Sequence, residues 1–248
     1  MNVVNILEVQ IAKRYIMKII VSLTTWKKRV DQTHLTIESI LNQTRKPDLV
    51  ELNLDYENFP NGLADLPESL LKLQDEGVQF HFGDRDLKCW QKLIPTWRAH
   101  KDDIEDWINI TLDDDQTYPS NYIEEIVKAH QYGDWGCTQH DSLTGGQWMH
   151  YSKRVVEQII DKLTDELVLE CPLDDFVIFH LIRPLKVRRC PRVDSVPKCR
   201  GTGFSFRRNF YPDQDPSRLS QGNYPSEEFQ REYKILVERG LVESRSAS

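Results

Sequence analysis

The chain has 248 residues and a formal net charge of −7, and 39% of its residues are hydrophobic and 10% aromatic. This length and composition can supply the core of one large domain or two small ones, so we expect a globular protein. The acidic balance argues against general affinity for nucleic acid.

The charge is unevenly distributed along the chain. Between Arg183 and Arg208 there are nine basic residues and a single acid, which gives this segment a charge of +8 and leaves −15 for the remainder. An acidic protein with one basic segment indicates a local anionic ligand such as a diphosphate, although a solvated basic face is the alternative. Arg200 and Arg207 lie in this segment and are candidate contacts for such a ligand.

The cysteine pattern and hydropathy constrain the location of the protein. The five cysteines are odd in number and form no C-x-x-C pair, so neither a disulfide framework nor a zinc site is indicated. No run reaches the roughly 18 apolar residues that a membrane span needs, and the N-terminus lacks the apolar core of a signal peptide. We expect a cytoplasmic protein, with peripheral association at the inner face of the cell membrane as an alternative.

The first strand is predicted at residues 19–23, after an extension of residues 1–16. Val3, Ile6 and other apolar residues of the extension are compatible with a short amphipathic helix or an additional strand. The strand runs into hydroxyl and cationic side chains that suit nucleotide contacts, although an ordinary loop between a strand and a helix uses the same residue types. These candidates are Ser22, Thr24, Thr25 and Arg29.

An alternation of helices and strands follows. Apolar residues at helical spacing predict a helix over 30–42, a strand over 49–54, a short helix over 66–75 and a strand over 78–82. The second strand ends in Asn53 and Asp55, which are further candidates for nucleotide contact. This order predicts an α/β fold with a mostly parallel sheet, flanked by helices and joined by right-handed crossovers.

A polar loop after residue 83 leads into a helix that ends near His100. Lys88 and Lys92 are four residues apart and would lie on one face of this helix. Solvated lysines are the simplest interpretation of that pair.

The most informative stretch is D-W-I-N-I-T-L-D-D-D-Q-T-Y-P, at residues 106–119. A buried strand at 107–112 stops at Asp113, Asp114 and Asp115. Adjacent carboxylates are stable only on a hydrated turn or around a cation, and oxygen clusters suit Mg²⁺ or Mn²⁺. Because ligands of open α/β sheets lie beyond the carboxyl ends of the strands, we expect a metal and diphosphate site here.

The second half of the chain carries another acidic pair. Asp174 and Asp175 precede an apolar run at 176–182 that predicts a helix, with one of the two acids as its N-cap. The other elements that the pattern predicts are helices at 121–130 and 155–163, a short strand at 135–138, a turn at 141–146, an edge strand at 186–193 and a helix at 226–239. We divide the chain into residues 1–16, a domain at 17–212 and a helical, polar tail at 213–248.

Five segments, taken together and in this order, resemble bacterial glycosyltransferases of the GT-A fold, which is related to the Rossmann fold. They are V-S-L-T-T-W-x-K-R, I-E-S-I-L-N-Q-T-R-K-P-D, K-C-W-Q-K-L-I-P, I-T-L-D-D-D-Q-T-Y-P and C-P-L-D-D. The similarity is greatest to enzymes that build capsular or lipopolysaccharide glycans, and it covers about residues 17–208. Trp26 stands where the family more often has tyrosine, and the extension before Met17 has no counterpart.

The resemblance implies a role for each segment. In the family's D-x-D motif, here Asp113 and Asp115, the acids hold Mn²⁺ or Mg²⁺ against the donor diphosphate. Lys92 occupies a place where the family supplies donor contacts, and Asp114 lies within the acidic motif. In inverting members the later acidic pair includes the catalytic base, which points to Asp175, with Asp174 as cap or acceptor contact. The implied partners are a nucleotide-sugar donor, with a UDP-sugar first, and a glycan or lipid-linked oligosaccharide acceptor.

Two other functions use similar residues. A sugar nucleotidyltransferase also sets aspartates at strand ends around Mg²⁺, but such enzymes usually carry a glycine-rich loop after the first strand, and residues 23–29 contain no glycine. A non-catalytic nucleotide-sugar-binding protein would not need the second acidic pair, because binding requires no base.

Overall fold

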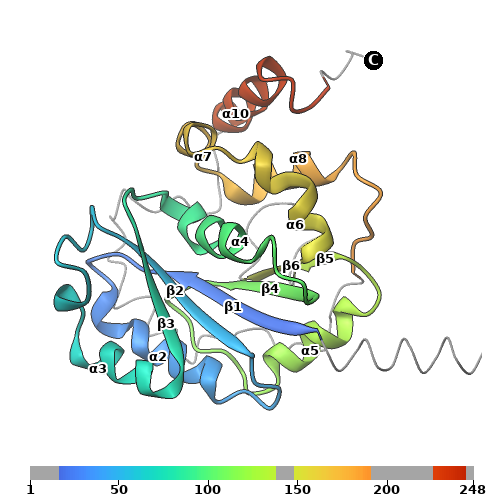
Figure 1. Ribbon diagram of the computed structural model, residues 1–248. Helices are drawn as coiled ribbons and strands as arrows, with labels where there is room; N and C mark the ends of the chain where they lie inside the picture. Colours follow the sequence, from blue (N-terminus) through green and yellow to red (C-terminus); the bar gives the residue numbers. More distant parts are fainter. Residues whose placement is uncertain (1–16, 138–147, 191–225, 244–248) are drawn as a thin grey trace, which may run out of the picture.

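A computed structural model describes residues 17–137, 148–190 and 226–243 (Figure 1). Several expectations lie outside these residues: the extension at 1–16, the turn at 141–146 and the part of the basic segment from residue 191 onward, which contains Arg200, Arg207 and Arg208.

A six-stranded sheet in the order β3-β2-β1-β4-β6-β5 forms the centre of the molecule. The four strands from β3 to β4 are parallel, and β6 lies antiparallel between β4 and β5. This confirms the α/β fold with a mostly parallel sheet. The strands are β1 (Lys18–Thr24), β2 (Leu49–Asp55), β3 (Val78–Gly83), β4 (Trp107–Leu112), β5 (Trp135–Cys137) and β6 (Trp148–Ser152).

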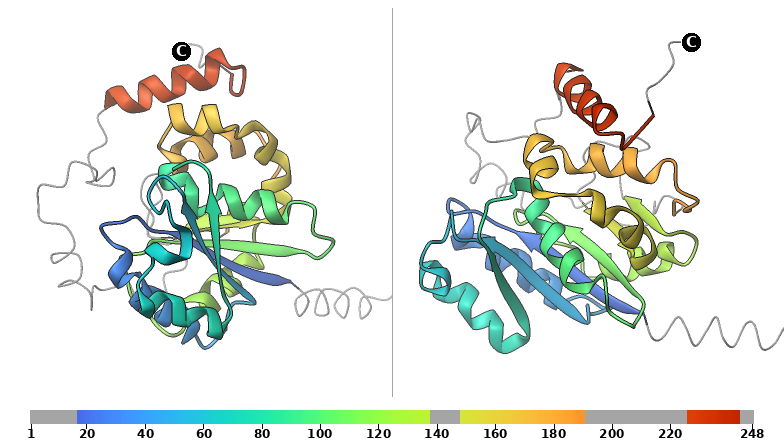
Figure 2. Two further views of the ribbon diagram at one scale, coloured as in Figure 1. Left: turned by 60° about the vertical axis from the view of Figure 1, so that its left-hand side comes forward. Right: turned by 45° about the horizontal axis from the view of Figure 1, so that its top comes forward.

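Helices cover both faces of the sheet (Figures 1 and 2). One face carries α2 (Val30–Leu41), α3 (Glu68–Leu71) and α5 (Tyr122–His130). The other carries α4 (Ile94–His100), α6 (Lys153–Ile159), α7 (Asp165–Glu170) and α8 (Asp174–Ile182), with α10 (Ser226–Glu238) packed outside α8. Short 3₁₀ helices complete the fold: η1 (Gly62–Asp65), η2 (Lys72–Glu76), η3 (Lys88–Lys92) and η4 (Ile160–Lys162).

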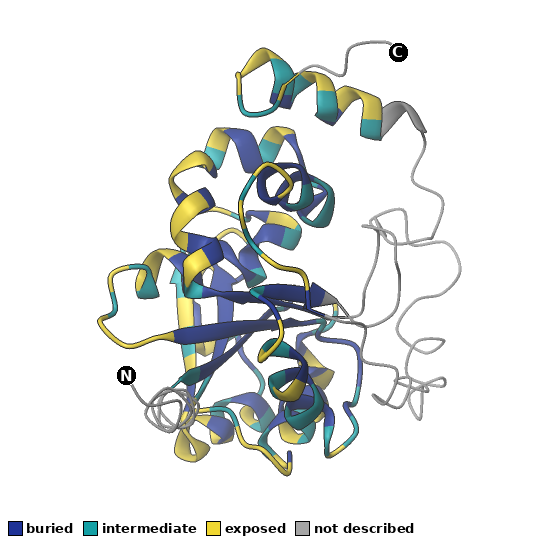
Figure 3. Cartoon of the chain, turned by 90° about the vertical axis from the view of Figure 1, so that its right-hand side faces the viewer, coloured by how far each residue is buried: buried dark blue, intermediate teal, exposed yellow. Residues whose placement is uncertain are grey.

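The two faces differ in polarity because side chains alternate along each strand. Toward α2 and α5, β1 directs Ile19, Val21 and Leu23 into one apolar core. Toward α4, the sheet buries polar residues among the apolar ones, namely Ser22, Glu51, Asn53 and Asn109. Figure 3 shows that the sheet strands are mostly buried. The polar face therefore needs internal hydrogen bonds.

Several sequence expectations need correction. The expected helix at 66–75 is a single α-turn, α3, that continues as the 3₁₀ helix η2 and stops at Gly77, whose φ of 92° is left-handed. The expected edge strand at 186–193 is wrong over its described part, where Arg189 makes one isolated bridge to Trp135. Strand β6 and helix α7 were not expected.

The last helix packs on the main body rather than extending freely. Leu236 of α10 is fully buried, and Glu232 accepts a hydrogen bond from the backbone N–H of Leu173 at 3.3 Å. The helix expected at 226–239 is thus confirmed, whereas the domain boundaries stay a prediction. Within the described ranges, none of the helices combines the length and the apolar character that crossing a bilayer would require.

Candidate functional site

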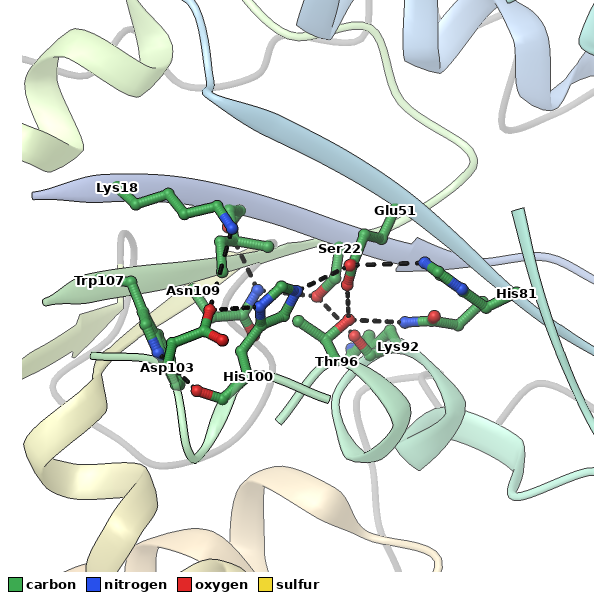
Figure 4. Close-up of polar contacts among 12 residues, drawn as sticks. Lys18, Ser22, Glu51, His81, Lys92, Thr96, His100, Asp103, Trp107 and Asn109 are labelled. Atoms are coloured by element: carbon green, nitrogen blue, oxygen red, sulfur yellow. Dashed lines mark hydrogen bonds and ion pairs between the residues drawn. The ribbon is translucent and has the colours of Figure 1, made fainter. Parts of the chain in front are cut away.

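The carboxyl ends of β1, β2 and β4 meet at one edge of the sheet, and η3 lies across them. Ser22 of β1 donates a hydrogen bond to the carbonyl oxygen of Lys92 at 2.6 Å, and Asn109 of β4 donates to the Ser22 hydroxyl at 2.9 Å (Figure 4). The Gln91 amide donates to the carbonyl oxygen of Leu54, in β2, at 2.7 Å. β1 and β2 therefore hold η3 directly, and β4 supports it through Ser22.

Trp90 connects η3 to the segment that begins α8. Its indole N–H donates to the carbonyl oxygen of Cys171 at 2.8 Å, and both residues are fully buried. Two of the segments that carried the family resemblance, K-C-W-Q-K and C-P-L-D-D, are thus joined by one hydrogen bond. The sequence suggested neither Trp90 nor Gln91 as a positioning residue.

Lys92 is the centre of an ionic group that we call the Lys92 cluster: Lys92, Asp113 and Asp174. The Lys92 ammonium lies 3.5 Å from Asp113 Oδ1 and 3.5 Å from Asp174 Oδ2. Burial alone would lower the pKa of Lys92, but Asp174, Asp113 and Asp175 raise it well above its usual value. The lysine is therefore a fixed positive charge between two acids from different segments.

The helical pairing expected for Lys88 and Lys92 is wrong. Their segment is a 3₁₀ helix with about three residues per turn, so residues four apart do not share a face. Lys88 has a left-handed φ of 58°, and its ammonium donates to Asp86 at 2.5 Å. Of these two lysines, Lys92 is the one that pairs with an acid at the end of β4, Asp113.

A second group, the Arg29 cluster, consists of Arg29, Thr25 and Asp114. The Arg29 guanidinium pairs directly with Asp114, and the Thr25 hydroxyl donates to the other oxygen of that carboxylate at 2.5 Å. The Asp114 side chain is only 4% exposed. Burial raises its pKa to about 6, with Arg29 acting in the opposite direction.

The three consecutive aspartates thus have different surroundings. Asp113 is the most accessible, with 38% of its side chain exposed, whereas Asp115 is 9% exposed and lies 3.7 Å from Arg29. Tyr118 fixes the turn: its hydroxyl accepts from the Asp113 N–H and donates to the Asp113 carbonyl oxygen, both at 3.0 Å. The turn after β4 is therefore held in one shape.

The acidic pair at the start of α8 does not cap the helix by side-chain hydrogen bonds, which corrects the N-cap prediction. The N-cap position is Leu173, and both Asp174 and Asp175 lie in the first turn. Negative side chains there still interact favourably with the helix dipole. Asp174 is buried against Lys92, while Asp175 is half-buried.

The candidates at the end of β2 are engaged in the fold. Asn53 donates to the Thr96 hydroxyl at 2.8 Å, and Asp55 accepts from the Asn58 N–H at 2.7 Å. Burial raises the pKa of Asp55. Thr24 is half-buried at the last position of β1. These residues lie near the carboxyl ends of β1 and β2, and they are not part of the Lys92 cluster.

A buried network under α4 supports this edge (Figure 4). Glu51 accepts from the Thr96 hydroxyl at 2.6 Å and lies 2.9 Å from His100 Nε2 and 3.4 Å from His81 Nε2. Burial alone would raise the pKa of Glu51, but hydrogen bonds from His100, His81 and Thr96 lower it to about 2. Glu51 is therefore a buried anion that holds α4 on the sheet.

The acids at the end of β4 have the chemistry that a hard divalent cation requires. Asp113 offers an accessible carboxylate, and Asp115 lies two residues away on a fixed turn. Among the described residues, no three acids bring carboxylate oxygens within 4.8 Å of one another. Mg²⁺ is usually bound through one or two carboxylates together with substrate phosphates and water, and Asp113 and Asp115 have the oxygen ligands that this requires.

Comparison with known proteins found no matching family model and no curated relative. Among solved structures, residues 1–349 of Staphylococcus aureus TarS in complex with UDP align with a TM-score of 0.52 and 11% identity, covering 72% of this chain and 58% of that one. A protein from Desulfovibrio desulfuricans G20, described as a nucleotide-diphospho-sugar transferase, aligns with a TM-score of 0.45 and 13% identity, covering 70% and 79%. The 4-diphosphocytidyl-2C-methyl-D-erythritol synthase of Anaerococcus prevotii gives a TM-score of 0.43 and 11% identity, covering 64% and 84%.

At these identities the likeness concerns the fold. The alignment with TarS reaches over most of this chain but over little more than half of the TarS fragment. The chain therefore has a GT-A-like, Rossmann-related α/β fold with a mixed, mostly parallel sheet.

Proposed function

We propose that this chain is a metal-dependent glycosyltransferase that moves a sugar from a nucleotide-sugar donor, with a UDP-sugar first, to a hydroxyl group of a glycan or lipid-linked oligosaccharide. The biological setting that we propose is bacterial surface polysaccharide synthesis, in the cytoplasm or at the inner face of the cell membrane. The observation that carries the proposal is the Lys92 cluster, in which three separate segments bring Lys92, Asp113 and Asp174 together at the carboxyl edge of a GT-A-like sheet.

The donor would bind across the ends of β1 and β4. Asp113 and Asp115 are the proposed cation ligands, and Lys92 the proposed diphosphate contact. A bound Mn²⁺ or Mg²⁺ neutralises charge on the departing diphosphate. The remaining residues proposed for donor contact are Ser22, Thr24, Thr25, Arg29, Asn53, Asp55 and Asp114, with Arg200 and Arg207 from beyond the described residues.

The geometry favours Asp175 over Asp174 as the catalytic base. Asp174 already faces the Lys92 ammonium at 3.5 Å and is 10% exposed, so its charge is engaged. Asp175 is more accessible on the same first turn of α8. With Asp175 taking the proton of the acceptor hydroxyl, direct attack of that oxygen on the sugar carbon would displace the nucleoside diphosphate in a single step with inversion.

The first experiment measures thermal stability with UDP, GDP and CTP, each with and without Mn²⁺. Stabilisation by UDP or GDP that depends on metal, and that is lost in Asp113→Ala and Asp115→Ala, supports the proposal. A preference for the triphosphate would support a sugar nucleotidyltransferase instead. Undiminished metal dependence in both variants would place the cation elsewhere.

The second experiment tests the base. Asp175→Asn should retain binding of donor and metal while slowing transfer by about 10²-fold or more, the usual scale for losing a positioned base. Asp174→Asn is the matched control, and it should affect donor binding through Lys92 more than the rate of transfer. The reverse pattern would exchange the two roles, and normal rates with normal folding in both would contradict the assignment.

A further inference from the structure

The segment after α8 returns to the sheet at its β5 edge (Figure 1). The Asp134 N–H donates to the carbonyl oxygen of Arg188 at 2.6 Å, and the Cys190 N–H donates to that of Trp135 at 2.7 Å. Two backbone hydrogen bonds therefore fix Cys190 against β5.

Cys190 completes a group of three metal-ligating side chains. His130 is the last residue of α5, and His150 lies at the centre of β6, where its backbone pairs with Gly136. One ligand atom from each of His130, His150 and Cys190 lies within 4.8 Å of the other two. His150 Nε2 is 3.2 Å from Cys190 Sγ, and the two imidazole rings meet edge to face at a centroid distance of 5.3 Å.

Two glycines permit this close approach. A Cβ atom at Gly136 would lie 2.7 Å from His150 Cε1, and one at Gly133 would lie 2.5 Å from the Cys190 nitrogen. Both distances are shorter than real Cβ contacts, so any other residue at either position would push the group apart. The close approach of the three ligands thus requires glycine at both positions.

We propose that His130, His150 and Cys190 bind one Zn²⁺ ion, with water in the fourth position. Two imidazole nitrogens and one thiolate are ligands typical of zinc. Zinc bonds of about 2.0–2.3 Å in a tetrahedron place ligand atoms about 3.3–3.6 Å apart, so a small contraction of the group closes the site. On binding, the Cys190 thiol gives its proton to solvent, and each neutral imidazole contributes one lone pair.

A further observation at this position supports the inference. The buried Nδ1 atom of His130 has no hydrogen-bond partner among the described residues, a state that costs free energy and that metal coordination would remove.

The proposed zinc site and the proposed donor site use different residues, and their ligands differ in chemistry. The acids after β4 offer hard oxygen ligands to Mg²⁺ or Mn²⁺, whereas this group offers nitrogen and sulfur. A zinc ion here would join α5, β6 and the segment after α8. Its expected effect is therefore on stability, and failure of the glycosyltransferase proposal would leave it untouched.

The test uses the full chain, stripped of metal and titrated with Co²⁺ and then with Zn²⁺ against a chromophoric chelator. We expect one equivalent of Co²⁺ to give a thiolate-to-cobalt charge-transfer band and tetrahedral d–d bands, both displaced by Zn²⁺, and Zn²⁺ to raise Tm. Cys190→Ser should abolish the charge-transfer band and weaken zinc by about 100-fold or more, since even changes to outer-shell partners cost about 10- to 100-fold.

Cys171→Ser is the matched control, because Cys171, at the C-terminal end of α7, is also a buried free cysteine but is not a member of this ligand group. It should keep both the band and the affinity. If Cys190→Ser does not fold, the partly exposed His130→Gln serves in its place, with the d–d bands and zinc affinity as readouts. Absence of the charge-transfer band in the wild-type protein, or equal affinity in wild type and the ligand variants, would overturn the proposal.

Discussion

The Lys92 cluster and the Arg29 cluster both join a cation to the same acidic turn, yet they are built differently. Arg29 and Thr25 enclose Asp114, which is 4% exposed and makes two close contacts. Lys92 lies at 3.5 Å from both Asp113 and Asp174, and Asp113 is 38% exposed. Neighbours in sequence therefore have different surroundings: Asp114 ties the turn to the loop between β1 and α2, while Asp113 is more exposed to solvent.

The largest difference between the two clusters should be in the free energy of unfolding that is lost when the acid of each cluster is replaced by alanine. Asp114→Ala removes the close, buried partner of Arg29, which keeps only the longer contact of 3.7 Å with Asp115, and should lower the free energy of unfolding by about 3 kcal/mol. Asp113→Ala should cost about 1 kcal/mol or less, because its side chain is partly exposed and its ion pair is loose. Urea unfolding of both variants gives the comparison, and equal losses would show that the clusters are not distinct in structural role.

The next largest effect should come from acidification, which removes the contribution of the Glu51 network to the free energy of unfolding. Glu51 has a folded pKa of about 2 against 4.5 for the ordinary carboxyl, so its stabilising contribution is complete above pH 4.5 and is lost as pH falls toward 2. The contribution reaches up to about 3 kcal/mol at 1.36 kcal/mol per pKa unit.

The Glu51→Gln variant isolates that contribution from the other acids. The difference in unfolding free energy between wild type and Glu51→Gln should be largest near pH 6 and shrink between pH 4.5 and 3. His100, whose pKa is raised chiefly by its hydrogen bond with Glu51, adds stability that is lost as pH rises through its own raised pKa. A difference that stays constant across this acidic range would contradict the role of Glu51.

A smaller effect is expected from Trp90→Phe, which removes one hydrogen bond to Cys171 and keeps most of the ring. The loss in unfolding free energy should be about 1–3 kcal/mol, since the Cys171 carbonyl is left unsatisfied in a buried position. Because the bond aligns Lys92 with Asp174, donor affinity should fall as well, measured by calorimetry with UDP and Mn²⁺. Trp107→Phe is the control, as Trp107 donates to the carbonyl oxygen of His100 at 3.0 Å, at the amino end of β4.

The smallest effect should come from Lys128→Ala. Lys128 lies 2.8 Å from both Glu124 and Glu125, so it has the same composition as the Lys92 cluster, one lysine between two acids. On α5, however, Lys128 is 54% exposed and Glu124 39% exposed, and ion pairs of exposed side chains contribute little. We expect no measurable change in Tm, and a clear loss would show that burial is not what separates strong from weak clusters here.

The parallel half of the sheet could be predicted from sequence because its signals are local. Residues 19–23, 49–54, 78–82 and 107–112 are short apolar runs separated by helical patterns, and all four are strands. Strand β6 was missed because its pairing with β4 and β5 is a tertiary property, and its five residues include His150, a polar side chain at a buried position.

The site was predictable in its parts and not in its assembly. The sequence indicated Lys92, Asp113 and Asp174 separately, but their meeting depends on the hydrogen bond from Trp90 to Cys171, 81 residues away. The three proposed zinc ligands, His130, His150 and Cys190, likewise lie on separate segments, so their spacing in the sequence does not indicate a zinc site. Sequence patterns report which residue types are present, whereas side-chain convergence is decided by how the chain returns to the sheet.

The central place of β1 has a consequence for synthesis on the ribosome. β1 is the first described strand, yet one of its two partners, β4, pairs Trp107 with Lys18, about 90 residues later. At about 5–20 residues per second, roughly 5–20 s pass before that partner is made. During this interval Ile19, Val21 and Leu23 belong to a strand with one open edge, so the nascent chain should depend on chaperones until β4 has emerged.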